Sequence, residues 1–376
     1  MREEGHGMQL PYSEKLNIEI LGRIFDNKSE CYKLFWFQAI MSGVEREKNE
    51  FTYEELIDEM IADAWYMVTE YHLNLGPNDT LEKAVNRVSE ISGLITAEKK
   101  EKVLEYLKNC DDRQVHEYKR SLTLNVPYRL QAPFLNFKTG DWGGTPRDLS
   151  DRINQQERLM YYFIAINGLD SRIRISDDWM EYLSHNHEII NGWIRYNTIT
   201  YLQRRNPNVP GISDKIDPPH ERNLEKVKKY WKLVTEISPV KEIYGSEIMT
   251  PSNISIDHFV PWSYVAHDEF WNLHPTTRSI NSSKSNNLPN WDHYFPLLAE
   301  LEYKSYSLMW QNEAVHKEFD KCAREHVNSA QVQNRLYREG LSKQEFEGEL
   351  KEIILPVYSA ARNCGFKDWE YSNDRI

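Results

Sequence analysis

The most constraining feature of this chain is a short apolar run that ends in an Asp-His pair. Residues 254–256 (Ile-Ser-Ile) alternate between apolar and polar side chains in the manner of a β-strand, and Asp257 and His258 follow directly. Pro261 then closes the run, because proline cannot donate a ladder hydrogen bond. Successive side chains of a strand point to opposite faces, so a turn or kink here is needed to aim both at one target.

A second strand and a helix are expected to follow. The return strand begins at residues 271–274 (Trp-Asn-Leu-His), and Ser279 is the expected N-cap of a helix. Asn281 and Lys284 lie three residues apart and therefore on one face of that helix. The order strand, loop, strand and helix predicts a small α+β module.

The polar residues of this module suit phosphodiester hydrolysis. Asp257 supplies an anionic oxygen and Asn281 a neutral amide oxygen, which are ligands for one hard divalent cation. His258 is suited to remove a proton from water near neutral pH. The alternative is that Asp257 and His258 form a buried, satisfied polar pair at a strand end.

Two further residues of the module receive supporting roles. Asn272 is interpreted as a residue that ties the loop by hydrogen bonds to the backbone and so fixes the His258 ring. Lys284 is a candidate for holding a phosphate. His267 and His274 are expected to be ordinary loop and strand histidines.

These residues resemble the HNH, or ββα-metal, endonucleases, in the subgroup that carries Asn in place of the last His. The segments that carry the resemblance are residues 256–263 and 281–289, which are similar to the HNH domain of RNA-guided CRISPR effectors. The resemblance implies a ββα fold, dependence on Mg²⁺ or Mn²⁺, and cleavage of DNA to leave 5′-phosphate and 3′-hydroxyl ends.

Outside residues 250–290 the resemblance is less specific. The segment at 201–210, ahead of the motif, is similar to bacterial HNH proteins of anti-phage defence or restriction. The chain lacks the arginine-rich bridge and the RuvC-like acidic motifs of an RNA-guided effector, so that mechanism is not implied. It also lacks the zinc-binding cysteines of many HNH proteins, so the module must be stabilised by packing against helices.

The rest of the chain is predicted to be mainly α, with the module embedded between helical regions. We expect a mostly helical N-terminal sensor or partner domain over 1–150 and a helical linker region with a basic segment over 151–245. The nuclease module occupies 246–295, and C-terminal helices over 296–376 pack on it. Residues 122–129 are expected to be extended, and residues 156–202 helical.

The net charge of −12 is unevenly distributed along the chain. Residues 1–112 carry 13 basic and 23 acidic residues, a net of −10, whereas residues 191–232 carry nine basic and four acidic residues, a net of +5. Within the basic segment, Arg204 and Arg205 are candidates for phosphate contacts. A solvated helix face explains the basic run equally well.

Compartment and cofactors follow from composition. No stretch reaches the roughly 18 continuous apolar residues of a membrane span, and a cytoplasmic protein is expected. The four cysteines are scattered singly, so neither a disulfide framework nor a structural zinc site is expected.

The leading hypothesis is a metal-dependent DNA endonuclease of bacterial defence, with Mg²⁺ or Mn²⁺ as cofactor and DNA as partner. The acidic N-terminal part can then be a sensor, a partner-binding surface or an autoinhibitory cover. The first alternative is a regulatory nucleic-acid-binding subunit of a defence complex, inactive without a partner. A partner protein or a second copy of the chain is compatible with both.

Overall fold

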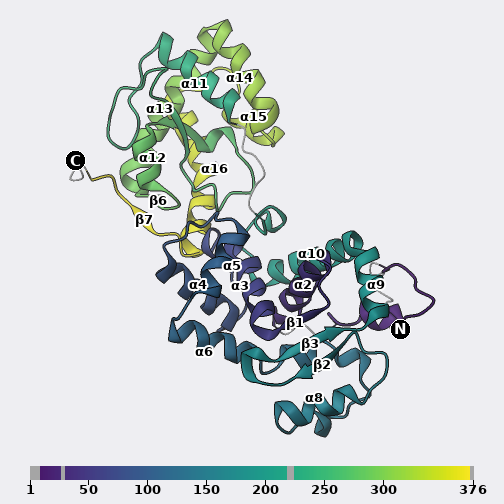
Figure 1. Ribbon diagram of the computed structural model, residues 1–376. Helices are drawn as coiled ribbons and strands as arrows, with labels where there is room; N and C mark the ends of the chain where they lie inside the picture. Colours follow the sequence, from purple (N-terminus) through teal and green to yellow (C-terminus); the bar gives the residue numbers. More distant parts are fainter. Residues whose placement is uncertain (1–8, 27–29, 218–223, 373–376) are drawn as a thin grey trace. The chain divides into compact units, whose positions relative to one another are not determined.

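The computed structural model describes residues 9–26, 30–217 and 224–372 and divides the chain into two compact units (Figure 1). Unit 1 comprises Met1–Pro207 and Lys215–Pro218, and unit 2 comprises Asn208–Asp214 and Pro219–Ile376.

Unit 1 is built mainly from helices. Its helices and strands, in chain order, are α1 (Ile18–Gly22), α2 (Tyr32–Glu45), β1 (Glu50–Thr52), α3 (Tyr53–Thr69), α4 (Thr80–Ser92), α5 (Lys100–Lys108), α6 (Arg113–Leu122), α7 (Val126–Arg129), α8 (Pro146–Asn154), β2 (Tyr161–Ala165), β3 (Arg172–Ile175), α9 (Asp177–His185) and α10 (His187–Arg205).

Helix α3 lies at the centre of this unit and begins at a capping box. The Thr52 hydroxyl accepts a hydrogen bond from the Glu55 backbone N–H, and the Glu55 carboxylate accepts one from the Thr52 N–H. The helix packs against α2 and α4, and the side chains of Trp36 and Trp65 are buried in the core they form.

Strands β1, β3 and β2 form an antiparallel sheet in that order. In β3, Ile173 and Ile175 are buried while Arg172 and Arg174 are exposed, and Arg174 pairs with Glu50 of β1 at 2.8 Å. The expectation of continuous helix over 156–202 is wrong at β2 and β3, because the period-2 alternation of β3 favours a half-buried strand. The sheet also joins residues on either side of the boundary expected near 150, and both sides belong to unit 1.

The extended segment expected at 122–129 is helical at both ends. Helix α6 ends at Leu122, and α7 covers Val126–Arg129 with Pro127 in its first turn. Proline is well suited to that position, since its missing N–H would have no intrahelical partner there. The proline therefore helps to start a helix instead of ending a strand.

Unit 2 holds the remaining helices and strands. They are α11 (Glu225–Ile237), β4 (Ser255–His258), β5 (Leu273–Thr276), α12 (Arg278–Lys284), β6 (Leu288–Pro289), α13 (Trp291–Gln311), α14 (Glu313–His326), α15 (Ala330–Leu336), α16 (Lys343–Asn363) and β7 (Asp368–Trp369).

Strands β4 and β5 pair antiparallel, and α12 follows them, so the expected strand, strand and helix module is present. One hydrophobic core joins the module to the surrounding helices. The Trp231 indole of α11 donates a hydrogen bond to the Leu273 carbonyl of β5 at 3.3 Å. Phe259, just after β4, packs its ring 6.1 Å from Trp291 and 6.3 Å from Tyr358. The helices thus supply the packing that holds a two-stranded ladder.

The mainly α fold with a small embedded α+β module is confirmed. Within the described parts of the chain, no helix combines the length and apolarity needed to cross a membrane.

A carboxyl group lies inside the core of unit 2. Glu302 of α13 is 2% exposed, and within the described ranges its Oε1 has no hydrogen-bond partner. Burial disfavours the charged form and raises the pKa of Glu302 well above its usual value of 4.5. The native state therefore keeps a proton that the unfolded chain releases above about pH 4.5. The stability associated with this group is complete below that pH and is lost as pH rises toward the folded-state pKa.

We predict that Glu302→Gln raises the free energy of unfolding at pH 8 by about 1–3 kcal/mol and changes it little at pH 4. The amide removes the ionisation while keeping the shape of the side chain. Urea denaturation followed by tryptophan fluorescence at the two pH values measures the effect. Glu300→Gln, on the exposed face of the same helix, is the matched control. An equal change at pH 4 and pH 8 would contradict the assignment.

Candidate active site

The ladder between β4 and β5 separates Asp257 from His258. Asp257 pairs with His274 and His258 pairs with Leu273, with no interruption between them. Because neighbouring side chains of an extended strand alternate, the two lie on opposite faces of the ladder. The structure shows no kink at this point, so each residue has its own set of contacts.

Asp257 lies beside a buried lysine. The Lys284 ammonium is 3.2 Å from Asp257 Oδ2 and 3.5 Å from Oδ1, and it donates a hydrogen bond to the His258 carbonyl at 2.7 Å. The Tyr244 hydroxyl lies 3.5 Å from Asp257 Oδ2. Lys284 has no exposed surface. A residue that contacts phosphate would lie at the surface. The charge of Lys284 is instead directed at Asp257, and its contacts hold α12 against β4.

His274 faces the same carboxylate across the ladder. Its Nε2 is 4.0 Å from Asp257 Oδ2, and neither of its ring nitrogens has a hydrogen-bond partner among the residues that the structure describes. Complete burial lowers the pKa of His274 to about 3, although the charge of Asp257 acts in the opposite direction. The imidazole is therefore neutral at physiological pH. No pattern in the sequence indicates that this strand histidine is buried without hydrogen-bond partners among the described residues.

His258 pairs with a carboxylate that the sequence analysis did not select. Its Nε2 is 2.7 Å from Asp268 Oδ1, and its side chain is 5% exposed. The backbone of Asp268 is fixed by a further hydrogen bond, which His326 Nδ1 donates to the Asp268 carbonyl oxygen at 2.8 Å. The sequence places a carboxylate, Asp268, in the loop ten residues after His258. The spacing alone does not show whether its side chain points toward His258.

Asn272 ties the loop after β4 to the start of β5. Its Oδ1 accepts from the Val260 N–H at 2.7 Å, and its Nδ2 donates to the Val260 carbonyl at 2.9 Å. The Asn272 backbone carbonyl also accepts from the Phe259 N–H at 2.9 Å. These bonds fix the backbone directly after His258, and Asn272 is completely buried.

Asn281 lies against β4 on the first helical turns of α12. Its Nδ2 donates to the Ile256 carbonyl at 3.0 Å and to Ser255 Oγ at 3.2 Å. Since a carbonyl can only accept, these contacts orient the amide with Oδ1 turned away from the strand. Helix α12 is capped by Thr277, whose hydroxyl accepts from the Ile280 N–H, so the cap expected at Ser279 is wrong.

The oxygens present suit a hard divalent cation. Asp257 offers a carboxylate and Asn281 an amide oxygen, both positioned by β4, and this donor type matches Mg²⁺ or Mn²⁺. Across the described ranges no group of three or more His, Cys, Asp or Glu side chains is placed to hold a metal ion. A cation here would need waters or substrate oxygens to complete its coordination, and it would share the Asp257 carboxylate with Lys284.

Arg204 and Arg205 belong to a different unit from this module. They end α10, which belongs to unit 1, whereas Asp257 belongs to unit 2. The Arg205 guanidinium stacks over the Tyr201 ring at 5.2 Å, and its Nε donates to the Tyr201 hydroxyl at 3.1 Å. Arg204 is exposed.

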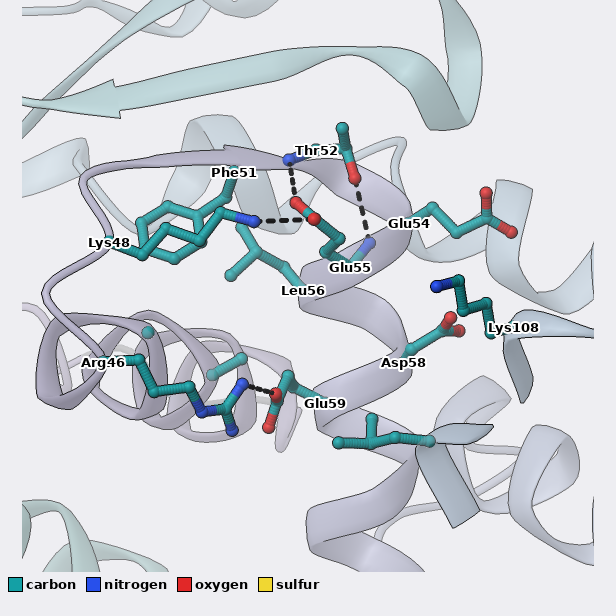
Figure 2. A pocket seen from close by; sticks show the side chains of 13 residues that line it. Arg46, Lys48, Phe51, Thr52, Glu54, Glu55, Leu56, Asp58, Glu59 and Lys108 are labelled. Atoms are coloured by element: carbon teal, nitrogen blue, oxygen red, sulfur yellow. Dashed lines mark hydrogen bonds and ion pairs between the residues drawn. The ribbon is translucent and has the colours of Figure 1, made fainter. Parts of the chain in front are cut away.

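A hollow of about 380 Å³ in unit 1 is lined by charged side chains (Figure 2). Figure 2 shows that these charges meet one another: Arg46 pairs with Glu59 and Lys48 with Glu55, both at 2.6 Å. Asp58 pairs with the buried Lys119 at 2.7 Å. Most of the charged side chains that line this hollow are therefore in ion pairs. The charges of the hollow are best explained as a structural network of ion pairs.

Comparison with protein families matches residues 240–290 to the HNH endonuclease family. This range contains β4, β5 and α12 and, with them, Asp257, His258, Asp268, Asn272, His274, Asn281 and Lys284. Comparisons with curated proteins and with solved structures gave no match.

We predict that Asn272→Ala lowers the free energy of unfolding of unit 2 by about 2–4 kcal/mol, because it leaves the N–H and C=O of Val260 without partners in a buried position. Urea denaturation of the full chain, followed by tryptophan fluorescence, measures the loss. Ser283→Ala, at an exposed position of α12, is the control. A change below about 0.5 kcal/mol in Asn272→Ala would show that the loop does not depend on this side chain.

Proposed function

We propose, from the HNH endonuclease domain that residues 240–290 form, that the protein is a metal-dependent endonuclease that hydrolyses phosphodiester bonds of DNA. The observation that carries the proposal is that Asp257 and His258 are adjacent on β4 within the matched range, and that Asn281 of α12 is hydrogen-bonded to the carbonyl of Ile256, the residue before Asp257. The resemblance of residues 201–210 to bacterial HNH proteins supports restriction of foreign DNA as the biological setting.

His258 is the proposed general base. Its Nε2–H donates to Asp268, which fixes the ring and stabilises the positive charge that the imidazole gains on accepting a proton. The lone pair of the neutral ring is then on Nδ1, and this atom accepts the proton of the attacking water. The water oxygen bonds to phosphorus as the bond from phosphorus to the 3′ oxygen breaks. The products are a 5′-phosphate and a 3′-hydroxyl.

Asp257 and Asn281 would hold the cation. When bound, Mg²⁺ or Mn²⁺ supplies stabilisation of the negative charge on the phosphoryl oxygens and on the departing 3′ oxygen. The protein's own contribution is rigid placement. Lys284 fixes Asp257 from one side, and the Ile256 carbonyl fixes the Asn281 amide from the other.

A second candidate is a nucleic-acid-binding subunit that stays inactive until a partner joins it. The observation that favours it is the state of Asp257, which is 6% exposed and paired with the ammonium of Lys284. In this arrangement the carboxylate is already neutralised, and a partner or the substrate would have to expose it.

Incubation of supercoiled plasmid with the full chain in Mg²⁺, Mn²⁺ or EDTA tests the proposal. We expect metal-dependent nicking or linearisation that falls about 100-fold or more in His258→Ala, since positioned acid-base groups contribute roughly 10²–10⁴ in rate. Asn281→Ala should lose activity as well, with partial recovery at raised Mn²⁺ concentration if the residue is a ligand.

Ser283→Ala, on the same helix as Asn281 and exposed, should cut as the wild type does. Cutting that survives His258→Ala would reject the assigned base. A wild-type protein that binds DNA but cuts in no metal would favour the partner-activated subunit.

A further inference from the structure

A groove of about 830 Å³ runs beside the candidate active site within unit 2. Helix α11 forms one wall, and the segment leading into β4 together with the start of α12 forms the other. The lining is rich in hydroxyl and basic side chains. Its three basic residues are Lys228, Lys232 and Arg278, against one carboxylate, Glu225.

The lysines of α11 divide into two sets with different surroundings. Lys226 and Lys229 turn toward α14, where Lys226 pairs with Glu325 and Lys229 pairs with Glu318 at 3.2 Å. Their charges are therefore compensated within the fold. The basic run that the sequence shows as a single patch is partly neutralised by a helix about 90 residues later.

Lys228 and Lys232 belong to the other set. They are four residues apart, which places them on one face of α11, about 6 Å apart along the helix axis. Both line the groove, and in the described part of the chain neither forms an ion pair with a carboxylate. Arg278 adds a third positive charge from the first, exposed residue of α12, also without a carboxylate partner among the described residues.

The groove is lined in part by β4, the strand that carries Asp257 and His258. Ser255 and Ile256 line the groove and directly precede Asp257. Asn281, the second oxygen donor, forms its hydrogen bonds to these two residues. A polyanion lying in the groove would therefore continue toward the proposed cleavage position without leaving the surface of unit 2.

We propose that this groove binds the phosphodiester backbone of the nucleic acid next to the bond that is cut, with Lys228, Lys232 and Arg278 as its phosphate contacts. The inference rests on the proposed nuclease function and adds to it the substrate path. Uncompensated lysine and arginine side chains contribute affinity by releasing the counterions of the phosphates. Contacts to phosphates carry no sequence information, so the groove positions the substrate without selecting a sequence.

Fluorescence anisotropy with a labelled DNA duplex, in EDTA so that no cutting occurs, tests the groove. The full-length wild type is compared with Lys228→Ala/Lys232→Ala over a series of KCl concentrations. Each phosphate contact contributes about 0.9 to the slope of log affinity against log salt, so the double variant should lower the slope by about 2. Its affinity near 100 mM salt should fall about tenfold or more, equally for two unrelated sequences.

Lys226→Ala/Lys229→Ala is the matched control, because it removes the same charge from the same helix on the face paired with α14. It should leave the salt slope close to that of the wild type. Lys228→Arg/Lys232→Arg, which keeps the charge, should retain binding and shows that loss in the alanine variant is not a folding defect.

The outcomes separate this inference from the proposed function. If Lys228→Ala/Lys232→Ala binds with the wild-type slope, or if both alanine doubles lose the same amount, the groove is not the substrate path, whatever the plasmid assay shows. Absence of duplex binding by the wild type also overturns it. If the groove variant loses binding while the wild type cuts no plasmid in any metal, the groove stands and the nuclease activity does not.

Discussion

The buried contact of Lys284 with Asp257 and the His258 carbonyl fastens helix α12 to strand β4, and the geometry of the site depends on it. Asn281, one turn earlier on the same helix, binds the Ile256 carbonyl. Two residues on one helix face therefore hold three consecutive residues of the strand. Removing one partner of such a buried ion pair costs roughly 3–5 kcal/mol because the other charge is left buried and uncompensated, so Lys284 and Asp257 depend on each other.

The module could be predicted from the sequence because its signals are local. Alternation at 254–256, the proline at 261 and the spacing of Asn281 and Lys284 each reflect backbone or helix geometry. Strands β2 and β3 were missed; β2 pairs with β3, and β3 also pairs with β1, more than 100 residues earlier, which a local pattern does not reveal. The contacts of His258 with Asp268 and of Lys284 with Asp257 were also missed. They depend on the path of a loop and on the packing of a helix, which local sequence patterns do not show. For the basic segment, only the structure shows which lysines meet carboxylates.

Unit 2 buries polar side chains at an energetic cost, both near the candidate site and in its core. In the described part of the chain, His274 has no hydrogen bond for either ring nitrogen, and Glu302 has none for Oε1. Such groups reduce stability unless something compensates them, and they are typical of places where function and stability compete. The helices around the ladder supply that compensation through a continuous aromatic and aliphatic core.

We propose that Asp257 and Asn281 together hold a divalent cation beside β4. Titration of the full chain with Mn²⁺, followed by the electron paramagnetic resonance signal of the free ion, tests this without any reliance on cleavage. We expect saturable binding of one ion per chain that is lost in Asn281→Ala and retained in Ser283→Ala. Binding that is unchanged in Asn281→Ala would contradict it, because the amide oxygen would then have no part in the site.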